Sequence, residues 1–231
     1  MDHLLSILTR KDSNMYTQKA PFGCSFAILG DSYSTFEGWI PEGYEVYYPR
    51  PEMVADVLSV EHTWWHLLMT KYNMELLLND AYSGSTVCTQ VREEHPQSAS
   101  FVERVQMVFS GERTGKQPDY IFLFGGTNDS WLGRRKGRLE FRRWTDRKLR
   151  KVIPAYCFVL SRLTKENPNS QIVAIVNTEL HPKIREAWLK AGERYGVKNV
   201  ALQEIDKQNG HPTKLGMEQI ARQVEAALLD K

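Results

Sequence analysis

Two turns of the chain carry residues that together can perform nucleophilic chemistry. Ser32 lies in the stretch GDSYS, directly after a short apolar run, and His211 lies near the C-terminus in the stretch NGHP. A serine at the turn after a buried strand can present its hydroxyl at the top of a sheet. A neutral imidazole can accept the hydroxyl proton near pH 7. Ser32 and His211 are therefore the candidate nucleophile and general base.

Two further turns carry groups that can stabilise an oxyanion. Gly84 lies in the stretch NDAYSGS and Asn128 lies in GGTND, each after an apolar run. A glycine offers its backbone amide with no side chain in the way, and an asparagine side chain can donate to a developing negative charge. Taken singly, each stretch is typical of an ordinary turn. The specific signal is the order Ser32, Gly84, Asn128, His211 along the chain.

The elements that must position these residues alternate between strands and helices. Five short apolar runs predict strands: Ser25–Gly30, Met74–Leu78, Tyr120–Phe124, Gln171–Val176 and Asn199–Leu202. They do not alternate strictly between apolar and polar residues, which is typical of strands buried on both faces of a parallel sheet. Four segments between or after these runs have apolar residues at helical spacing: Ser98–Phe109, Val152–Thr164, Pro182–Tyr195 and Pro212–Leu229. This alternation predicts an α/β/α sandwich whose strand ends share one edge.

The four stretches resemble the four sequence blocks of the SGNH, or GDSL-type, hydrolases. They are GDSYS at 30–34, YSGST around Gly84, GGTND at 125–129 and GHP at 210–212, in the family order. The resemblance implies a flavodoxin-like three-layer fold with a five-stranded parallel sheet, and neither a metal nor an organic cofactor. It also implies that Ser32 attacks an ester carbonyl to form an acyl-enzyme while His211 takes the proton. The oxyanion would be held by the amides of Ser32 and Gly84 and the side chain of Asn128.

One position departs from the family pattern. The family usually carries an aspartate three residues before the histidine, and Gln208 stands there. A glutamine oxygen can fix the imidazole tautomer but offers no charge, and loss of such a carboxylate from a serine-protease triad costs about 10⁴ in turnover. Two acids are alternatives: Asp206, and Glu179 just past the fourth predicted strand, which its placement favours. Otherwise Gln208 or a backbone carbonyl orients the ring of His211.

The substrate class is less constrained than the chemistry. We expect a short-acyl esterase that removes O-acetyl groups from carbohydrate, because the aromatic, Gly- and Pro-rich segment Ser34–Tyr72 offers faces that can stack on sugar rings. The same aromatic residues equally suit a helix packed on the sheet. One alternative is a lysophospholipase or acyl-thioester hydrolase. Another is a catalytically impaired carbohydrate-binding relative, which Gln208 motivates.

One stretch is strongly basic. Residues 134–151 contain ten Lys or Arg against Glu140 and Asp146. Such a run is typical of a solvated helix face. Because it follows Asn128 closely, the alternative is that it borders the pocket and attracts an anionic substrate, such as a uronic-acid polymer or a phospholipid head group. No nucleic-acid partner is expected, since no recognition fold accompanies it.

Length and composition predict one ordinary globular domain. The 231 residues are 42% apolar and 25% charged, which suits a single domain over residues 1–231 with 1–24 as an N-terminal extension. No apolar run approaches a membrane span and no signal-peptide pattern is present, so we expect no stable membrane insertion. The chain as written would be cytoplasmic, or periplasmic or secreted if a leader had been removed. The three cysteines, odd in number and without CxxC spacing, are expected to be free, and the oligomeric state is left open.

Overall fold

The computed structural model describes residues 21–89, 100–108 and 115–230, and their centre is a five-stranded sheet. Its strands are β1 (Ser25–Gly30), β2 (Glu75–Ala81), β3 (Tyr120–Phe124), β4 (Gln171–Val176) and β5 (Lys198–Ala201). All neighbours pair in parallel in the order β2-β1-β3-β4-β5. This is the flavodoxin-like doubly wound order. The predicted sheet is thereby confirmed. The first 20 residues of the expected N-terminal extension lie outside the described residues.

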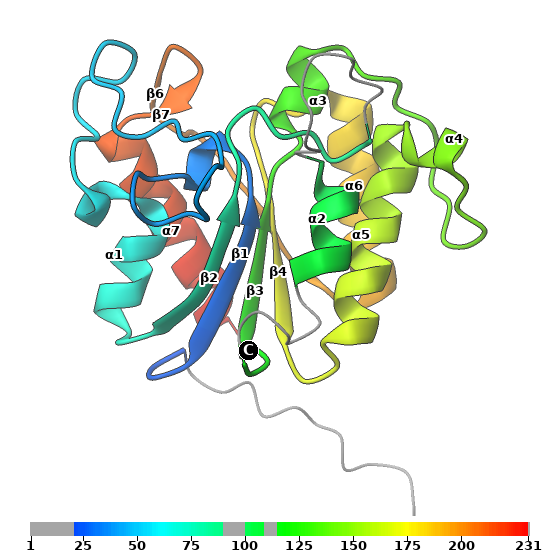
Figure 1. Cartoon of the computed structure of the whole chain (residues 1–231), viewed down its shortest axis with the longest axis horizontal. Coiled ribbons are helices and arrows are strands. Elements are labelled where there is room, and N and C mark those ends of the chain that lie inside the picture. The colour runs from blue at the N-terminus through cyan, green and yellow to red at the C-terminus, as the bar shows by residue number, and fades with distance from the viewer. Residues whose placement is uncertain (1–20, 90–99, 109–114, 231) are drawn as a thin grey trace, which may run out of the picture.

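Helices cover both faces of the sheet, as Figure 1 shows. One face packs against α1 (Trp64–Lys71) and α7 (Lys214–Leu229), and the other against α2 (Phe101–Val108), α5 (Val152–Glu166) and α6 (Pro182–Tyr195). Short elements complete the fold: η1 (Ser32–Ser34), η2 (Val60–His62), α3 (Thr127–Trp131), α4 (Asp146–Leu149) and the hairpin of β6 (Lys207–Gln208) and β7 (His211–Pro212). None of the helices in the described ranges has the length and apolarity that crossing a bilayer requires.

Burial on both faces explains why the central strands are unbroken apolar runs. Side chains alternate across a strand. Along β1, Phe26 and Ile28 enter the core beneath α1 and α7, whereas Ala27 and Leu29 enter the core beneath α2, α5 and α6. Cys24, Cys88 and Cys157 are buried free thiols, as expected.

Several predicted boundaries differ from the structure, and two of the differences have identifiable reasons. β2 extends to Ala81, past the predicted end at Leu78, because its polar residues are satisfied inside the fold: the Asn79 side-chain amide donates to the Ser34 carbonyl oxygen at 2.9 Å. The last helix begins at Lys214 and not at Pro212. The Thr213 hydroxyl caps it by accepting from the Gly216 amide, and the two residues before that cap form β7.

The strand order reverses between β1 and β3. In open α/β sheets ligands bind at the carboxyl ends of the strands where the order reverses. Here η1 follows β1 and α3 follows β3 at that edge (Figure 1). The glycine pair between β3 and α3 permits close packing, because a Cβ at Gly125 would lie 2.2 Å from the Phe101 ring and one at Gly126 would lie 2.1 Å from the Trp188 ring.

Candidate active site

Ser32 and His211, 179 residues apart, meet at this edge of the sheet. The Ser32 hydroxyl oxygen lies 3.0 Å from Nε2 of His211, and both residues are buried. Ser32 opens the turn η1, which Asp31 caps by accepting from the Tyr33 amide at 3.1 Å. The glycine before this turn is required by space, because a Cβ at Gly30 would lie 2.9 Å from Cβ of Ser34. A nucleophile and a base are thus within hydrogen-bond reach.

A tight hairpin presents His211. Asn209 and Gly210 connect β6 to β7 with φ of 47° and 76°, the positive values that a two-residue type I′ turn requires. Nδ1 of His211 lies 3.2 Å from the Asn209 carbonyl oxygen. Because a carbonyl can only accept, Nδ1 carries the proton in this contact, and Nε2 of the neutral ring is left as the acceptor for Ser32.

Glu179, the acid that placement favoured, does not orient the imidazole. One carboxylate oxygen accepts from Nζ of Lys207 at 2.8 Å and the other from the Trp131 indole at 3.0 Å. The Lys207 side chain is only 10% exposed, and a charge that is largely removed from water needs a counter-ion. This pairing explains why Glu179 does not accept the proton of His211.

Gln208 and Asp206, the other two candidates, also point elsewhere. The Gln208 side-chain oxygen accepts from the Ala55 amide at 3.2 Å, and Asp206 accepts from the Thr213 hydroxyl. Of the alternatives, a backbone carbonyl is therefore the group that the structure places on Nδ1 of His211.

Lys207 is a buried cation close to the site. Besides Glu179, its ammonium donates to Oδ1 of Asn177 at 3.2 Å and Oγ1 of Thr178 at 3.1 Å, and it lies 5.3 Å from the centre of the Tyr33 ring. Burial lowers the pKa of Lys207, and the Glu179 carboxylate opposes that shift. These contacts fasten β6 to the carboxyl end of β4.

An aromatic cage surrounds the imidazole. The Tyr47 ring stacks on the His211 ring with centroids 3.6 Å apart and planes 8° apart. Trp131 lies edge-on with centroids 5.6 Å apart, and the Tyr33 ring is tilted with centroids 5.4 Å apart. Burial lowers the pKa of His211 to about 4, although the Asn209 carbonyl and the charge of Glu179 act in the opposite direction. The ring is therefore neutral at pH 7.

The expected oxyanion donors lie on the turns after β1, β2 and β3. Among the described residues, the amides of Ser32 and Gly84 donate to no protein acceptor. Gly84 has φ of +78°, and the space that its Cβ would occupy is open. The Asn128 side-chain amide donates one hydrogen to the Ser85 carbonyl at 2.8 Å, which fixes its orientation and leaves the second hydrogen available.

Buried charges that the sequence reasoning missed hold these turns. Both oxygens of Asp129 accept backbone amides, from Val87 at 2.7 Å and Cys88 at 3.2 Å, and so clamp the end of the Gly84 turn to α3. Burial raises the pKa of Asp129 to about 6. The signal for this residue was present in the stretch GGTND, where only the asparagine was singled out.

Arg104 provides a second clamp. Its guanidinium pairs with Asp80 at 2.9 Å, and it also donates to the Gly30 carbonyl at 3.0 Å and to Oγ of Ser85 at 2.7 Å. It therefore ties the ends of β1 and β2 together. No sequence signal marks an arginine on an apolar helix as buried.

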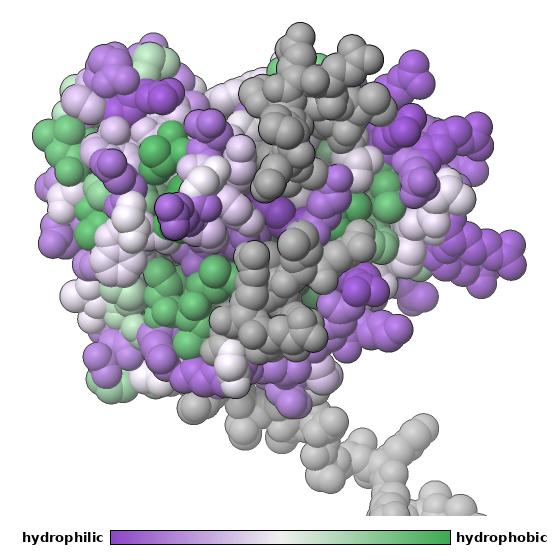
Figure 2. All heavy atoms as spheres, in the orientation of Figure 1, coloured by the Kyte–Doolittle hydropathy of each residue, from purple (hydrophilic) through white to green (hydrophobic). Residues whose placement is uncertain are grey.

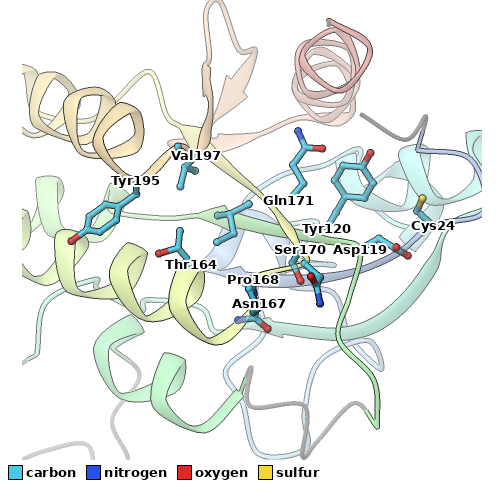
Figure 3. A pocket seen from close by; sticks show the side chains of 13 residues that line it. Cys24, Asp119, Tyr120, Thr164, Asn167, Pro168, Ser170, Gln171, Tyr195 and Val197 are labelled. Carbon is cyan, nitrogen blue, oxygen red and sulfur yellow. The ribbon is translucent and has the colours of Figure 1, made fainter. Parts of the chain in front are cut away.

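A cavity of about 560 Å³ lies at the opposite edge of the sheet. Figure 3 shows its lining, with Tyr195 from the end of α6, Thr164 from α5, and Asp119 and Gln171 at the starts of β3 and β4. Asp119 is engaged by the amide and hydroxyl of Ser25 at 2.8 and 2.9 Å. This cavity shares no residue with the Ser32 site. Nor does any group of three His, Cys, Asp or Glu suited to a metal ion occur in the described ranges.

Comparison with known proteins decides the family. Residues 24–228 match the family model of the GDSL-like lipases/acylhydrolases. The chain belongs to this family. This GDSL-like protein is accordingly an ester hydrolase, as the four sequence blocks predicted.

Solved structures agree with that assignment. A GDSL-like lipase from Bacteroides uniformis is 37% identical with a TM-score of 0.78, covering 87% of this chain and 93% of that one. One from Bacteroides ovatus is 34% identical, also with a TM-score of 0.78, covering 88% and 97%. A family two carbohydrate esterase from Clostridium thermocellum shares the fold at 15% identity and a TM-score of 0.59, covering 89% and 63%. A search of curated protein sequences gave no match.

Proposed function

We propose that this GDSL-like hydrolase cleaves carboxylic esters through an acyl-enzyme on Ser32. The observation that supports this proposal is the 3.0 Å contact between the Ser32 hydroxyl and Nε2 of His211. His211 removes the proton as the hydroxyl oxygen attacks the ester carbonyl, and it then gives the proton to the departing alcohol. A water molecule, activated by the same imidazole, releases the acyl group.

The developing oxyanion is stabilised by three donors. These are the backbone amides of Ser32 and Gly84 and the side chain of Asn128. A single donor of this kind contributes about 10²- to 10³-fold to turnover. The clamps at Asp129 and Arg104 keep the donors in place before substrate binds, which is the condition for such stabilisation.

The mechanism operates as a Ser–His dyad supported by a backbone carbonyl. The Asn209 carbonyl oxygen fixes the tautomer of His211 without supplying a negative charge. The imidazolium that forms during reaction lies face-to-face with the Tyr47 ring at 3.6 Å. The π-face of an aromatic ring attracts a cation by roughly 0.5–2 kcal/mol. Tyr47 thus partly replaces the missing carboxylate.

For the substrate we favour an O-acetyl ester of a carbohydrate. Trp131 lies beside His211 with 46% of its surface exposed, and Trp39 on the aromatic segment is 39% exposed. Exposed indoles suit sugar rings, which present apolar faces. A family two carbohydrate esterase from Clostridium thermocellum has the same fold, which supports a carbohydrate ester as the substrate. The intact contact between Ser32 and His211 argues against a catalytically impaired relative.

Initial rates on p-nitrophenyl esters from acetate to palmitate test the proposal. We expect turnover by the wild type with an optimum at acetate, none above background by Ser32→Ala, and near wild-type rates by Ser83→Ala, which removes a neighbouring hydroxyl as a control. An optimum at long acyl chains would instead favour the lysophospholipase or thioesterase alternative. Equal rates for wild type and Ser32→Ala would refute the assignment of the nucleophile.

A further inference from the structure

A strongly basic loop extends from the active-site edge of the molecule. Residues 134–151, here called the basic loop, connect α3 to α5 and include α4. They contain ten of the 30 Lys and Arg but two of the 28 Asp and Glu, so the basic loop carries a formal charge of +8 and the rest of the chain −6. Figure 2 shows hydrophilic side chains gathered over α4 and its flanks, at the right of the view.

The underside of the basic loop is packed against the core. Three of its apolar side chains contact the core beneath α5 and α6: Leu139, Trp144 and Leu149. The Trp144 ring meets Phe158 edge-on at 5.6 Å. The base of the loop is closed where the amides of Val152 and Ile153 donate to the carbonyls of Arg135 and Lys136 at 3.0 and 2.9 Å. The loop is therefore a fixed scaffold.

The outer side of the basic loop presents arginines to solvent. Six are exposed: Arg135, Arg138, Arg142, Arg143, Arg147 and Arg150. Within the described part of the chain, no carboxylate forms an ion pair with any of them. Glu140, one of the two acids of the loop, is paired with Lys148. No described carboxylate therefore neutralises the charge of these six arginines.

The basic loop begins next to the catalytic centre. Trp131 lies three residues before it and contacts the His211 ring at 5.6 Å. The Arg134 amide donates to the Asp129 carbonyl at 2.9 Å, which fixes the start of the loop to α3. A chain-like substrate with its ester at Ser32 that crosses Trp131 would therefore reach the arginines.

We propose that the basic loop binds the anionic chain of an acidic polysaccharide whose ester group is cleaved at Ser32. This inference rests on the proposed function. Seven of the ten cations are arginines, whose planar guanidinium matches a carboxylate in two parallel hydrogen bonds. A uronic-acid chain offers both those carboxylates and hydroxyls that can carry acyl esters, whereas a nucleic acid carries no carboxylic ester.

A membrane surface is a poorer match. Insertion at an interface needs apolar side chains directed outward. Three of the four large apolar side chains of the loop pack against the core, and the fourth, Phe141, is 36% exposed and lies beside Tyr195 with ring centroids 5.9 Å apart.

Binding of polygalacturonate without acyl groups tests this inference separately from catalysis. The loop variant Arg142→Gln/Arg143→Gln/Arg147→Gln is compared with a control that loses three exposed charges elsewhere, Lys165→Gln/Lys190→Gln/Arg222→Gln. By calorimetry at low salt, we expect wild type and control to bind alike, and the loop variant to bind about tenfold more weakly, since each exposed ion pair changes affinity a few-fold. On acetylated polygalacturonate, kcat/KM falls by a similar factor, while p-nitrophenyl acetate hydrolysis is unchanged in both variants.

Two results would overturn the inference. One is equal binding of polygalacturonate by wild type and loop variant. The other is loop-dependent binding to vesicles of anionic lipid or to DNA without binding to polygalacturonate. If loop-dependent polymer binding occurs but wild type hydrolyses no ester, the binding surface stands and the esterase proposal is the one that fails.

Discussion

Replacing Glu179 by glutamine separates two accounts of the histidine. If the carboxylate served as the third member of a triad, its loss would cost about 10⁴ in turnover. In the structure it contacts Lys207 and Trp131, and the Asn209 carbonyl contacts Nδ1 of His211. We therefore expect Glu179→Gln to lower kcat by tenfold at most, because its charge reaches the imidazole only at a distance.

The main effect of this substitution should be on stability. Breaking a fully buried ion pair by removing one partner costs about 3–5 kcal/mol, and a surface pair contributes at most about 1 kcal/mol. The Lys207 side chain is 10% exposed and that of Glu179 is 32% exposed, so the pair lies between these limits. In the variant, the Lys207 ammonium still donates hydrogen bonds to Oδ1 of Asn177 and Oγ1 of Thr178. We estimate a loss of about 1–3 kcal/mol in the free energy of unfolding.

Urea unfolding and initial rates with p-nitrophenyl acetate at pH 7 measure both effects. The double variant Glu179→Gln/Lys207→Met serves as the control, because it removes the buried ammonium together with its partner and should recover most of the lost stability. A fall in kcat approaching 10⁴ in Glu179→Gln, with unfolding unchanged, would refute the reasoning and return Glu179 to the role of triad acid.

Four further predictions follow from the site. Asn128→Ala should lower kcat by about 10²–10³ with little change in KM, measured by steady-state kinetics. Because burial lowers the pKa of His211 to about 4, the acid limb of kcat/KM should lie near pH 4, leaving about 90% of the maximum at pH 5, where an unshifted pKa of 6.5 would leave about 3%. Arg104→Met should lower the free energy of unfolding in urea by about 3–5 kcal/mol, since it leaves the buried Asp80 carboxylate without its cation. Tyr47→Phe should retain most activity while Tyr47→Leu loses several-fold, because only the phenylalanine keeps the stack on the imidazole.

The parts of the fold that could be predicted are those with a local signal. Four elements have the expected residue bounds: β1, β3, β4 and α6. The three strands are buried apolar runs that end at turn residues, and α6 starts with a proline in its first turn. For the aromatic segment Ser34–Tyr72, the structure confirms the alternative in which aromatic residues pack a helix on the sheet. Trp64 and Trp65, the first residues of α1, pack in the core, while Tyr47 of the same segment stacks on His211.

What could not be predicted depends on contacts between distant residues. The hairpin that carries His211 has two-residue strands, too short for any periodicity. Its conformation is set by the positive φ of Asn209 and by long-range bonds, such as that from the Tyr48 hydroxyl to the Pro212 carbonyl at 2.8 Å. The partner of Glu179 likewise depended on where Lys207 comes to lie. The position of Glu179 after the fourth strand predicts that it lies at this edge of the sheet. It does not predict which basic side chain pairs with it.

The combination of Gln208 and Lys207 has a consequence for the chemistry. A residue that cannot be charged stands where the family places an aspartate, and the lysine next to it pairs with Glu179, the acid that placement favoured. The carboxylate and ammonium largely cancel at the imidazole, so burial dominates and His211 is held neutral. A base with a low pKa is a weak proton acceptor, but it is in the reactive form at every pH above about 5. The site therefore has a smaller driving force for proton transfer, but its base stays neutral in acidic surroundings. This suits an acidic polysaccharide, whose negative charge lowers the pH near its own surface.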